Sequence, residues 1–180
     1  MNDAWRDVVG KLDFFAGCSI DDLIDVSCSH FLPNIDPRLF KAQLIAESNL
    51  DPNAVSPVGA VGVAQFMPDT WQDVIRELDY PLDSKATNPS LAIPAAAYYM
   101  AKQLDGWTSP RPEIDRYCLA LASYNAGFGN MLDAQKFAGG ALGYAPIAYH
   151  LKSVTGGHSS ETTDYVKRIY SIYFRNVVSL

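Results

Sequence analysis

The sequence predicts a mostly α-helical protein, and three observations carry this prediction. Apolar residues recur every three or four positions along most of the chain, whereas the alternation typical of strands is nearly absent. Prolines stand at the start of four of these periodic segments, which is the first-turn position that proline favours in helices: Pro37, Pro68, Pro89 and Pro112. The 180 residues, 48% hydrophobic and 19% charged, suffice for one domain with its own core.

The first helices are expected in the acidic N-terminal part of the chain. Ser19 is a suitable N-cap for a short helix over residues 20–26, and Asp36 caps a longer one that runs to Ser48 and stops at Asn49. Before them, a short amphipathic helix is expected from apolar residues that share one side: Trp5, Val8, Val9, Leu12 and Phe15.

The rest of the chain alternates between expected helices and loops. Residues 55–65 are small and include glycines, which is typical of a loop. Further helices are expected at 68–78, 89–104, 112–126 and 165–173, with Gly127 ending the third of these. The segment 137–160 is the least regular part, and we expect it to form a loop over any functional site.

Composition and charge exclude several classes of partner. The net charge of −6 and pI of 4.9 argue against nucleic acid, because phosphate binding needs clustered Lys and Arg. Apolar runs are too short for membrane insertion, and the first residues lack the apolar core of a signal peptide. We therefore expect a monomer made in the cytoplasm without a signal peptide. Its three cysteines are expected to be reduced thiols, and its three scattered histidines indicate no metal or cofactor.

Glu47 is the first candidate for chemistry. It shares a face of its helix with Phe40 and Leu44, so its carboxyl lies on the apolar stripe near the helix C-terminus. Desolvation and the negative end of the helix dipole both favour the protonated acid, which is the form a proton donor needs. A glutamate turned to the rim, or paired with an arginine, is the alternative.

Three further segments carry polar and aromatic groups suited to a sugar polymer. Glycines at 59 and 62 let backbone approach a ligand, and Gln65 offers a donor and an acceptor before Met67. Tyr124 and Asn125 place a hydroxyl and an amide at the end of another helix. Glu161 begins the last polar-aromatic segment. Each of these signals alone is also typical of ordinary core, cap or surface residues.

In chain order, these segments resemble the soluble lytic transglycosylase (SLT) family over residues 36–175. The matching motifs are Glu47-Ser48, Gly59-x-x-Gly62-x-x-Gln65-Phe66-Met67-Pro68-x-Thr70, Ala120-x-x-x-Tyr124-Asn125-Ala126-Gly127 and Glu161-Thr162-x-x-Tyr165-Val166. The resemblance implies a lysozyme-like helical globule that cleaves bacterial peptidoglycan. Residues 36–180 would form the catalytic domain, and residues 1–35 a helical extension packed on its core.

The family's chemistry implies one catalytic carboxyl, Glu47. It would protonate the glycosidic oxygen between N-acetylmuramic acid and N-acetylglucosamine, then take the proton of the muramoyl C6 hydroxyl as a 1,6-anhydro ring closes. By the same matching, the substrate-binding residues would be Ser48, Gln65, Met67, Tyr124, Asn125 and Glu161. The chain departs from many members at Phe128-Gly129-Asn130, where those members carry a basic residue.

Two alternatives stay open. A goose-type lysozyme would use water on the same substrate and would need a second acid, for which Asp51 and Asp69 are the candidates. A virion or assembly protein would instead grip the wall without cutting it. The setting expected for all three is bacteriophage lysis or wall penetration, reaching the periplasmic wall through a holin or as a virion component. Residues 1–35 could then dock on a phage particle or a secretion apparatus.

Overall fold

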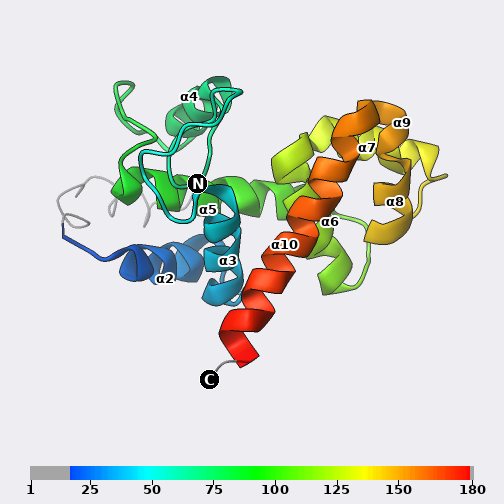
Figure 1. Ribbon diagram of the computed structural model, residues 1–180, viewed down its shortest axis with the longest axis horizontal. Helices are drawn as coiled ribbons and strands as arrows, with labels where there is room; N and C mark the ends of the chain where they lie inside the picture. The colour runs from blue at the N-terminus through cyan, green and yellow to red at the C-terminus, as the bar shows by residue number, and fades with distance from the viewer. Residues whose placement is uncertain (1–16, 179–180) are drawn as a thin grey trace. The chain divides into compact units, whose positions relative to one another are not determined.

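The computed structural model describes residues 17–178, with side chains through residue 176. The chain divides into two compact units, Met1–Tyr98 with Ile172–Leu180 (unit 1) and Tyr99–Ser171 (unit 2). Helices make up most of each unit (Figure 1). Two helices, α5 (Pro89–Gly106) and α10 (Ser159–Val178), contribute residues to both units.

Unit 1 opens with α2 (Ile20–Phe31) and α3 (Pro37–Ser48), whose predicted caps are confirmed. The Ser19 hydroxyl accepts the Asp22 N–H at 3.2 Å, while the Ser19 N–H donates to the Asp22 carboxylate at 3.0 Å. Asp36 accepts the Arg38 N–H at 2.9 Å, and α3 ends at Asn49 in the left-handed region. Each of these helix ends is therefore satisfied by a neighbouring residue of its own segment.

Helix α2 packs against α3 through its apolar side. Leu23, Ile24 and Cys28 are buried, and Lys41 of α3 reaches Asp21 of α2 at 2.6 Å. Burial raises the pKa of the Cys28 thiol to about 12, so this cysteine stays protonated. The helix expected from Trp5 to Phe15 lies outside the described residues, and the domain boundary at residue 35 stays a prediction.

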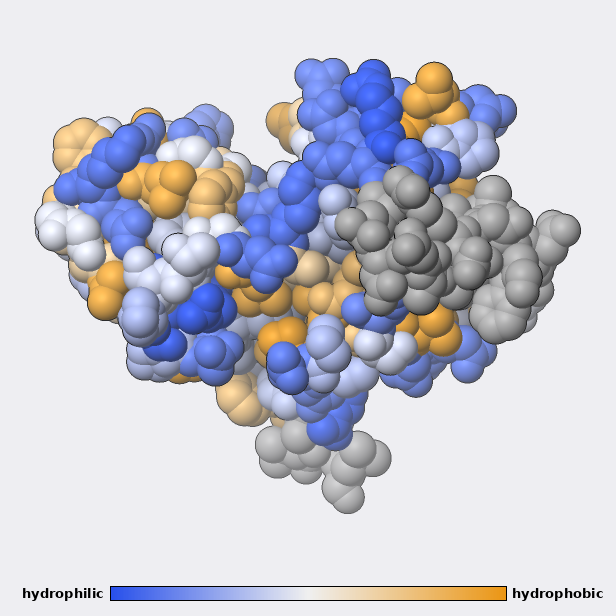
Figure 2. Space-filling model, turned by 180° about the vertical axis from the view of Figure 1, so that it is seen from behind, coloured by the Kyte–Doolittle hydropathy of each residue, from blue (hydrophilic) through white to orange (hydrophobic). Residues whose placement is uncertain are grey.

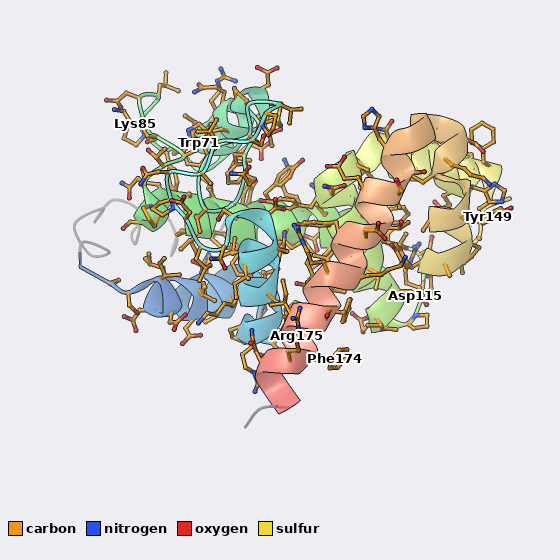
Figure 3. The ribbon with its side chains drawn as sticks, in the orientation of Figure 1. Trp71, Lys85, Asp115, Tyr149, Phe174 and Arg175 are labelled. Carbon is orange, nitrogen blue, oxygen red and sulfur yellow. The ribbon has the colours of Figure 1, made fainter. Side chains whose placement is uncertain are left out.

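The loop that follows α3 leads to α4 (Pro68–Glu77) and α5, both of which begin at a proline as expected. Phe66 and Trp71 pack with ring centroids 5.2 Å apart, and the Trp71 indole donates to the Ser84 carbonyl at 2.8 Å (Figure 3). Pro94 lies inside α5 without the N–H that would bond to the preceding turn. The helix continues because its neighbours are buried: Leu91, Ala92, Ile93, Ala95, Ala96 and Ala97.

Unit 2 contains α6 (Glu113–Ala126), α7 (Phe128–Phe137), α8 (Tyr144–His150), α9 (Lys152–Thr155) and the short 3-10 helix η2 (Gly156–His158). Gly127 ends α6 at φ 88, as expected. The loop predicted over 137–160 is wrong for most of its length, because α8, α9, η2 and the start of α10 occupy it. Ile147 and Leu151 are completely buried there, so tertiary packing stabilises helices that are too short to be stable alone.

Extended structure is limited, within residues 17–178, to two isolated antiparallel bridges, Val55 with Val61 and Val61 with Phe66. The prediction of a mostly α-helical fold is confirmed. In the described part of the chain, no helix has the combination of length and apolar character that crossing a bilayer requires.

Candidate active site

Glu47 lies in the last turn of α3. Phe40 and Leu44, which share its face, are completely buried, whereas Glu47 itself is half-buried. The carboxyl thus belongs to a stripe that enters the core at its N-terminal end and reaches the surface at its C-terminal end. The helix ends two residues later at Asn49, with φ 56, so Glu47 lies close to the negative end of the helix dipole.

Ser48 connects the end of α3 to the glycine-bearing segment of residues 54–66, which we call the Gly-loop. Its hydroxyl donates to the Val63 carbonyl at 2.9 Å, and Val63 is completely buried. This bond fixes the last turn of α3, and with it the backbone of Glu47, against the Gly-loop. The sequence motif Glu47-Ser48 therefore places a positioning hydroxyl beside the candidate acid.

Gly62 allows the Gly-loop to pack tightly. Its φ is +81, and a Cβ at this position would lie 2.1 Å from the backbone oxygen of Ala86. Its N–H donates to the Ala54 carbonyl at 2.9 Å, which closes the loop at its base. Only glycine combines this backbone conformation with such a close approach.

Gln65 holds the Gly-loop from within. Its φ is 49, and its side-chain Nε2 donates to the Gly62 carbonyl at 2.9 Å and to the Ala54 carbonyl at 3.3 Å. The donor half of the amide is therefore engaged in the loop itself. The acceptor half, Oε1, is the part of Gln65 that a bound ligand would use.

Exposed apolar side chains accompany the Gly-loop in unit 1. Met67, which precedes α4, is 44% exposed, and Val55 and Val58 are 68% and 75% exposed. On the face drawn in Figure 2, hydrophilic residues divide the apolar surface into separate patches. Apolar side chains near a polar loop suit a sugar ring, which presents both hydroxyls and C–H faces.

The two alternative acids occupy ordinary structural positions. Asp51 is exposed, and its carboxylate accepts the Asn53 N–H at 2.8 Å, which closes a local turn. Asp69 is exposed in the first turn of α4, where a negative charge complements the helix dipole. Neither has the half-buried setting of Glu47.

The second group of expected site residues belongs to unit 2. Tyr124 is half-buried near the end of α6, and its ring packs edge-on against Tyr99 with centroids 5.2 Å apart. The residue before it, Ser123, is completely buried and accepts the Trp107 indole N–H at 3.1 Å. Aromatic packing and this hydrogen bond fix the end of α6.

Asn125 joins α6 to the first turns of α10. Its side-chain oxygen accepts the hydroxyl of Thr162 at 2.8 Å, and Thr162 is only 3% exposed. Glu161, the neighbouring residue, points its carboxylate outward with a side chain 72% exposed, 4.0 Å from His158. The structure thus brings Asn125 into contact with the final motif through Thr162, while Glu161 lies at the surface.

The structure gathers the expected site residues in two sets. Ser48, the residue after Glu47, and Gln65, two residues before Met67, both bond to carbonyls of the Gly-loop. Tyr124, Asn125 and Glu161 form the other set in unit 2. Among residues 17–178, no three His, Cys, Asp or Glu side chains lie close enough together to hold a metal ion.

A buried polar residue outside the sequence motifs lies on the same helix as Glu47. Gln43 of α3 is completely buried, and neither atom of its amide has a hydrogen-bond partner. It lies three residues after Phe40 and four before Glu47, on the stripe that Phe40, Leu44 and Glu47 already define. The signal was therefore present in the sequence as a polar residue at a core position of this helix.

Residues 32–144 match the family model described as the transglycosylase SLT domain, which covers more than half of the chain. The chain belongs to the transglycosylase SLT domain family. The match includes Glu47, the Gly-loop and the end of α6, and it stops before α10.

Curated relatives agree with this family. The chain is 35% identical over 130 residues to the membrane-bound lytic murein transglycosylase F of Shewanella sediminis, covering 71% of this chain and 25% of that protein. It is 35% identical over 104 residues to the membrane-bound lytic murein transglycosylase F 1 of Alkalilimnicola ehrlichii, covering 58% of this chain and 20% of that one. The chain thus spans about a quarter or less of the relatives' length.

The fold has a counterpart among solved structures. The 70 kDa soluble lytic transglycosylase of Escherichia coli superposes with a TM-score of 0.63 and 25% sequence identity, covering 87% of this chain and 24% of that one. The predicted lysozyme-like helical fold is confirmed by this likeness.

Proposed function

We propose that this SLT domain is a peptidoglycan lytic transglycosylase that uses Glu47 as its single acid and base. Glu47 carries the proposal, because it is the half-buried acid at the end of α3 that Ser48 ties to the Gly-loop. The family match and the names of the relatives support the same reaction.

In the proposed reaction, the protonated Glu47 carboxyl donates its proton to the oxygen that joins N-acetylmuramic acid to N-acetylglucosamine. The bond from C1 to that oxygen breaks as an oxocarbenium-like state develops. The carboxylate then takes the proton of the muramoyl C6 hydroxyl, whose oxygen bonds to C1. The proton count of Glu47 is restored, no water is consumed, and the new end is 1,6-anhydro-N-acetylmuramic acid.

The surrounding residues would bind and orient the glycan strand. The free Oε1 of Gln65 would accept a hydrogen bond from a sugar hydroxyl or acetamido group, because its Nε2 is already bonded to the Gly-loop. The exposed Met67 would contact an apolar sugar face. Tyr124, Asn125 and Glu161 stay predicted substrate-binding residues, with Asn125 acting from a side chain already bonded to Thr162.

A goose-type lysozyme is the second candidate, and the positions of the alternative acids argue against it. Asp51 uses its carboxylate to close a local turn, and Asp69 lies exposed at the start of α4. An inverting hydrolase needs a second carboxylate that activates water across the sugar ring from the acid. The phage setting and the docking role of residues 1–35 stay predictions.

The test is a mass spectrum of the soluble products from purified peptidoglycan. Products one water lighter than ordinary muropeptides, with anhydromuramic ends, are expected from the wild-type chain. Glu47→Gln should lower the rate at least about 100-fold with the fold unchanged, because the amide cannot donate the proton. Asp51→Asn and Asp69→Asn serve as matched controls and should keep most of the activity.

Three other results would overturn parts of the proposal. Reducing muramic ends would make the protein a lysozyme and would return attention to Asp51 and Asp69. Wild-type activity in Glu47→Gln would show that another group is the acid. Binding to peptidoglycan without any product would favour a wall-binding protein.

A further inference from the structure

Gln43 is a buried amide in an otherwise apolar part of α3. It has no exposed surface, and neither its Nε2 nor its Oε1 has a hydrogen-bond partner. The residues on either side, Ala42 and Leu44, are also completely buried. A leucine or methionine would fill such a position without polar atoms that need a partner.

Buried amides without partners are rare in folded proteins, and a catalytic role is one of the few reasons that they persist. Gln43 lies four residues before Glu47, and residues at this spacing are neighbours on one face of a helix. Helical side chains lean toward the N-terminus of their helix. The Glu47 side chain therefore leans over the turn that contains Gln43.

The chemistry of an amide suits a carboxyl that changes its protonation state. A protonated carboxyl has an O–H to donate and finds an acceptor in Oε1, whereas a carboxylate accepts and finds a donor in Nε2. A lysine or arginine at the same place would favour only the carboxylate, and a leucine could hydrogen-bond to neither protonation state. Because glutamine is neutral and has both a donor and an acceptor, it can hydrogen-bond to the protonated and to the ionised carboxyl without forming an ion pair.

We propose that Gln43 is a positioning residue for Glu47, with its amide hydrogen-bonded to the Glu47 carboxyl in both protonation states during catalysis. This inference rests on the proposed function, because it assigns Gln43 to the acid and base of that reaction. Gln43 would orient the Glu47 carboxyl from the buried face of α3, whereas Ser48 fixes the same helical turn through its bond to Val63 of the Gly-loop.

The experiment compares Gln43→Met with wild type in steady-state cleavage of purified peptidoglycan strands and in thermal unfolding. Methionine keeps the length of the side chain and removes both hydrogen-bonding atoms. The expected result is a kcat lowered roughly tenfold or more with KM within about twofold, because orientation of the reacting carboxyl is lost while sugar binding is not. The melting temperature should stay the same or rise, because an unsatisfied buried amide is gone.

A matched control comes from α5. Gln103 is 5% exposed and its Oε1 also has no partner, so Gln103→Met makes the same change at a buried amide of unit 2. Its kcat should stay within about twofold of wild type, and its thermal unfolding is measured beside that of Gln43→Met. Wild-type kcat in Gln43→Met, or an equal loss of kcat in both variants, would overturn the inference.

A second measurement on the wild-type fold covers the case in which Gln43→Met does not fold. The side-chain amide signals of Gln43 in a ¹⁵N-labelled chain should move with the same midpoint as the Glu47 carboxyl carbon, and should lose this movement in Glu47→Gln. Gln43 signals that do not respond to Glu47 would overturn the inference. If the wild-type chain releases no anhydro products at all, the proposed function has failed instead, and the two failures are thereby distinguished.

Discussion

Helix α3 of unit 1 and helix α8 of unit 2 satisfy the N–H groups of their first turns by different means. Helix α3 begins with Asp36, whose carboxylate accepts an N–H two residues later. Helix α8 begins at Gly143, which has no side chain to offer, and the N–H of Tyr144 donates instead to Asp115 of α6 at 2.7 Å (Figure 3). The cap of α3 is thus local, whereas the cap of α8 comes from a residue 29 positions away.

The same contrast holds at the candidate site. Gln65 bonds to Gly62, three residues before it, and Ser48 bonds to Val63, 15 residues after it. In unit 2, Asn125 bonds to Thr162 across 37 residues. The expected site residues of unit 1 are therefore organised within one stretch of chain, whereas those of unit 2 depend on how α6 and α10 pack.

The largest effect is expected at Gly62. This residue both has a positive φ within the Gly-loop and packs closely against the backbone of Ala86. Gly62→Ala should lower the free energy of unfolding by about 2–5 kcal/mol, because a Cβ both strains the backbone at φ +81 and lies 2.1 Å from the Ala86 oxygen. Gly59→Ala is the matched control, since its φ is +89 with nothing within 4 Å, and should cost only about 1–2 kcal/mol. Equal losses in urea unfolding would show that backbone strain alone matters in the Gly-loop.

The Asn125–Thr162 bond should show the next largest effect. Asn125→Ala leaves the buried Thr162 hydroxyl without its acceptor and should destabilise by about 1–3 kcal/mol. Thr162→Val should cost less, because the exposed Asn125 amide then bonds to water. A double-mutant cycle by urea unfolding measures the coupling, and a coupling near zero would remove the contrast between the units.

A smaller effect is expected at the start of α8, where the acceptor is Asp115 of α6. Asp115→Ala should destabilise by about 1 kcal/mol, because the first turn of α8 loses its acceptor. Hydrogen exchange should quicken in α8 itself, although the changed residue is in α6. Ser19→Ala, which removes the local cap of α2, should quicken exchange only in α2. Quickened exchange confined to α6 in Asp115→Ala would contradict the assignment.

The smallest effect concerns pH. The Arg38 side chain, with help from the Tyr173 hydroxyl at 2.9 Å, lowers the pKa of Asp36 to about 2, from an ordinary value of 3.8. Its contribution to stability is therefore complete above about pH 4 and is lost as the pH falls through about 2. Between these values, wild type should lose stability more steeply than Asp36→Asn, which still caps α3. Urea midpoints that fall equally with pH in wild type and in Asp36→Asn would contradict this prediction.

The pattern of caps also explains which elements the sequence predicts well. Ser19, Asp36, Pro68 and Gly127 lie beside the helix ends that they determine, and each of those ends was predicted. The sequence does not predict helices α7, α8 and α9, none of which has a side-chain cap at its start. Gln43 was missed for a related reason, since its importance comes from burial and not from its neighbours in sequence.

The sequence by itself determined the helical fold class, the ends of the helices with their own caps, and the motif order that names the SLT family. These features depend on contacts within a few residues, which the order of the amino acids specifies directly. Only the tertiary structure decided that the segment after residue 137 is largely helical. It also decided that the Gln65 Nε2 donates to the Gly-loop, and that the Gln43 amide is buried without a hydrogen-bond partner. Each of these depends on which surfaces pack together, because burial and long-range hydrogen bonds are properties of the folded chain and not of any one segment.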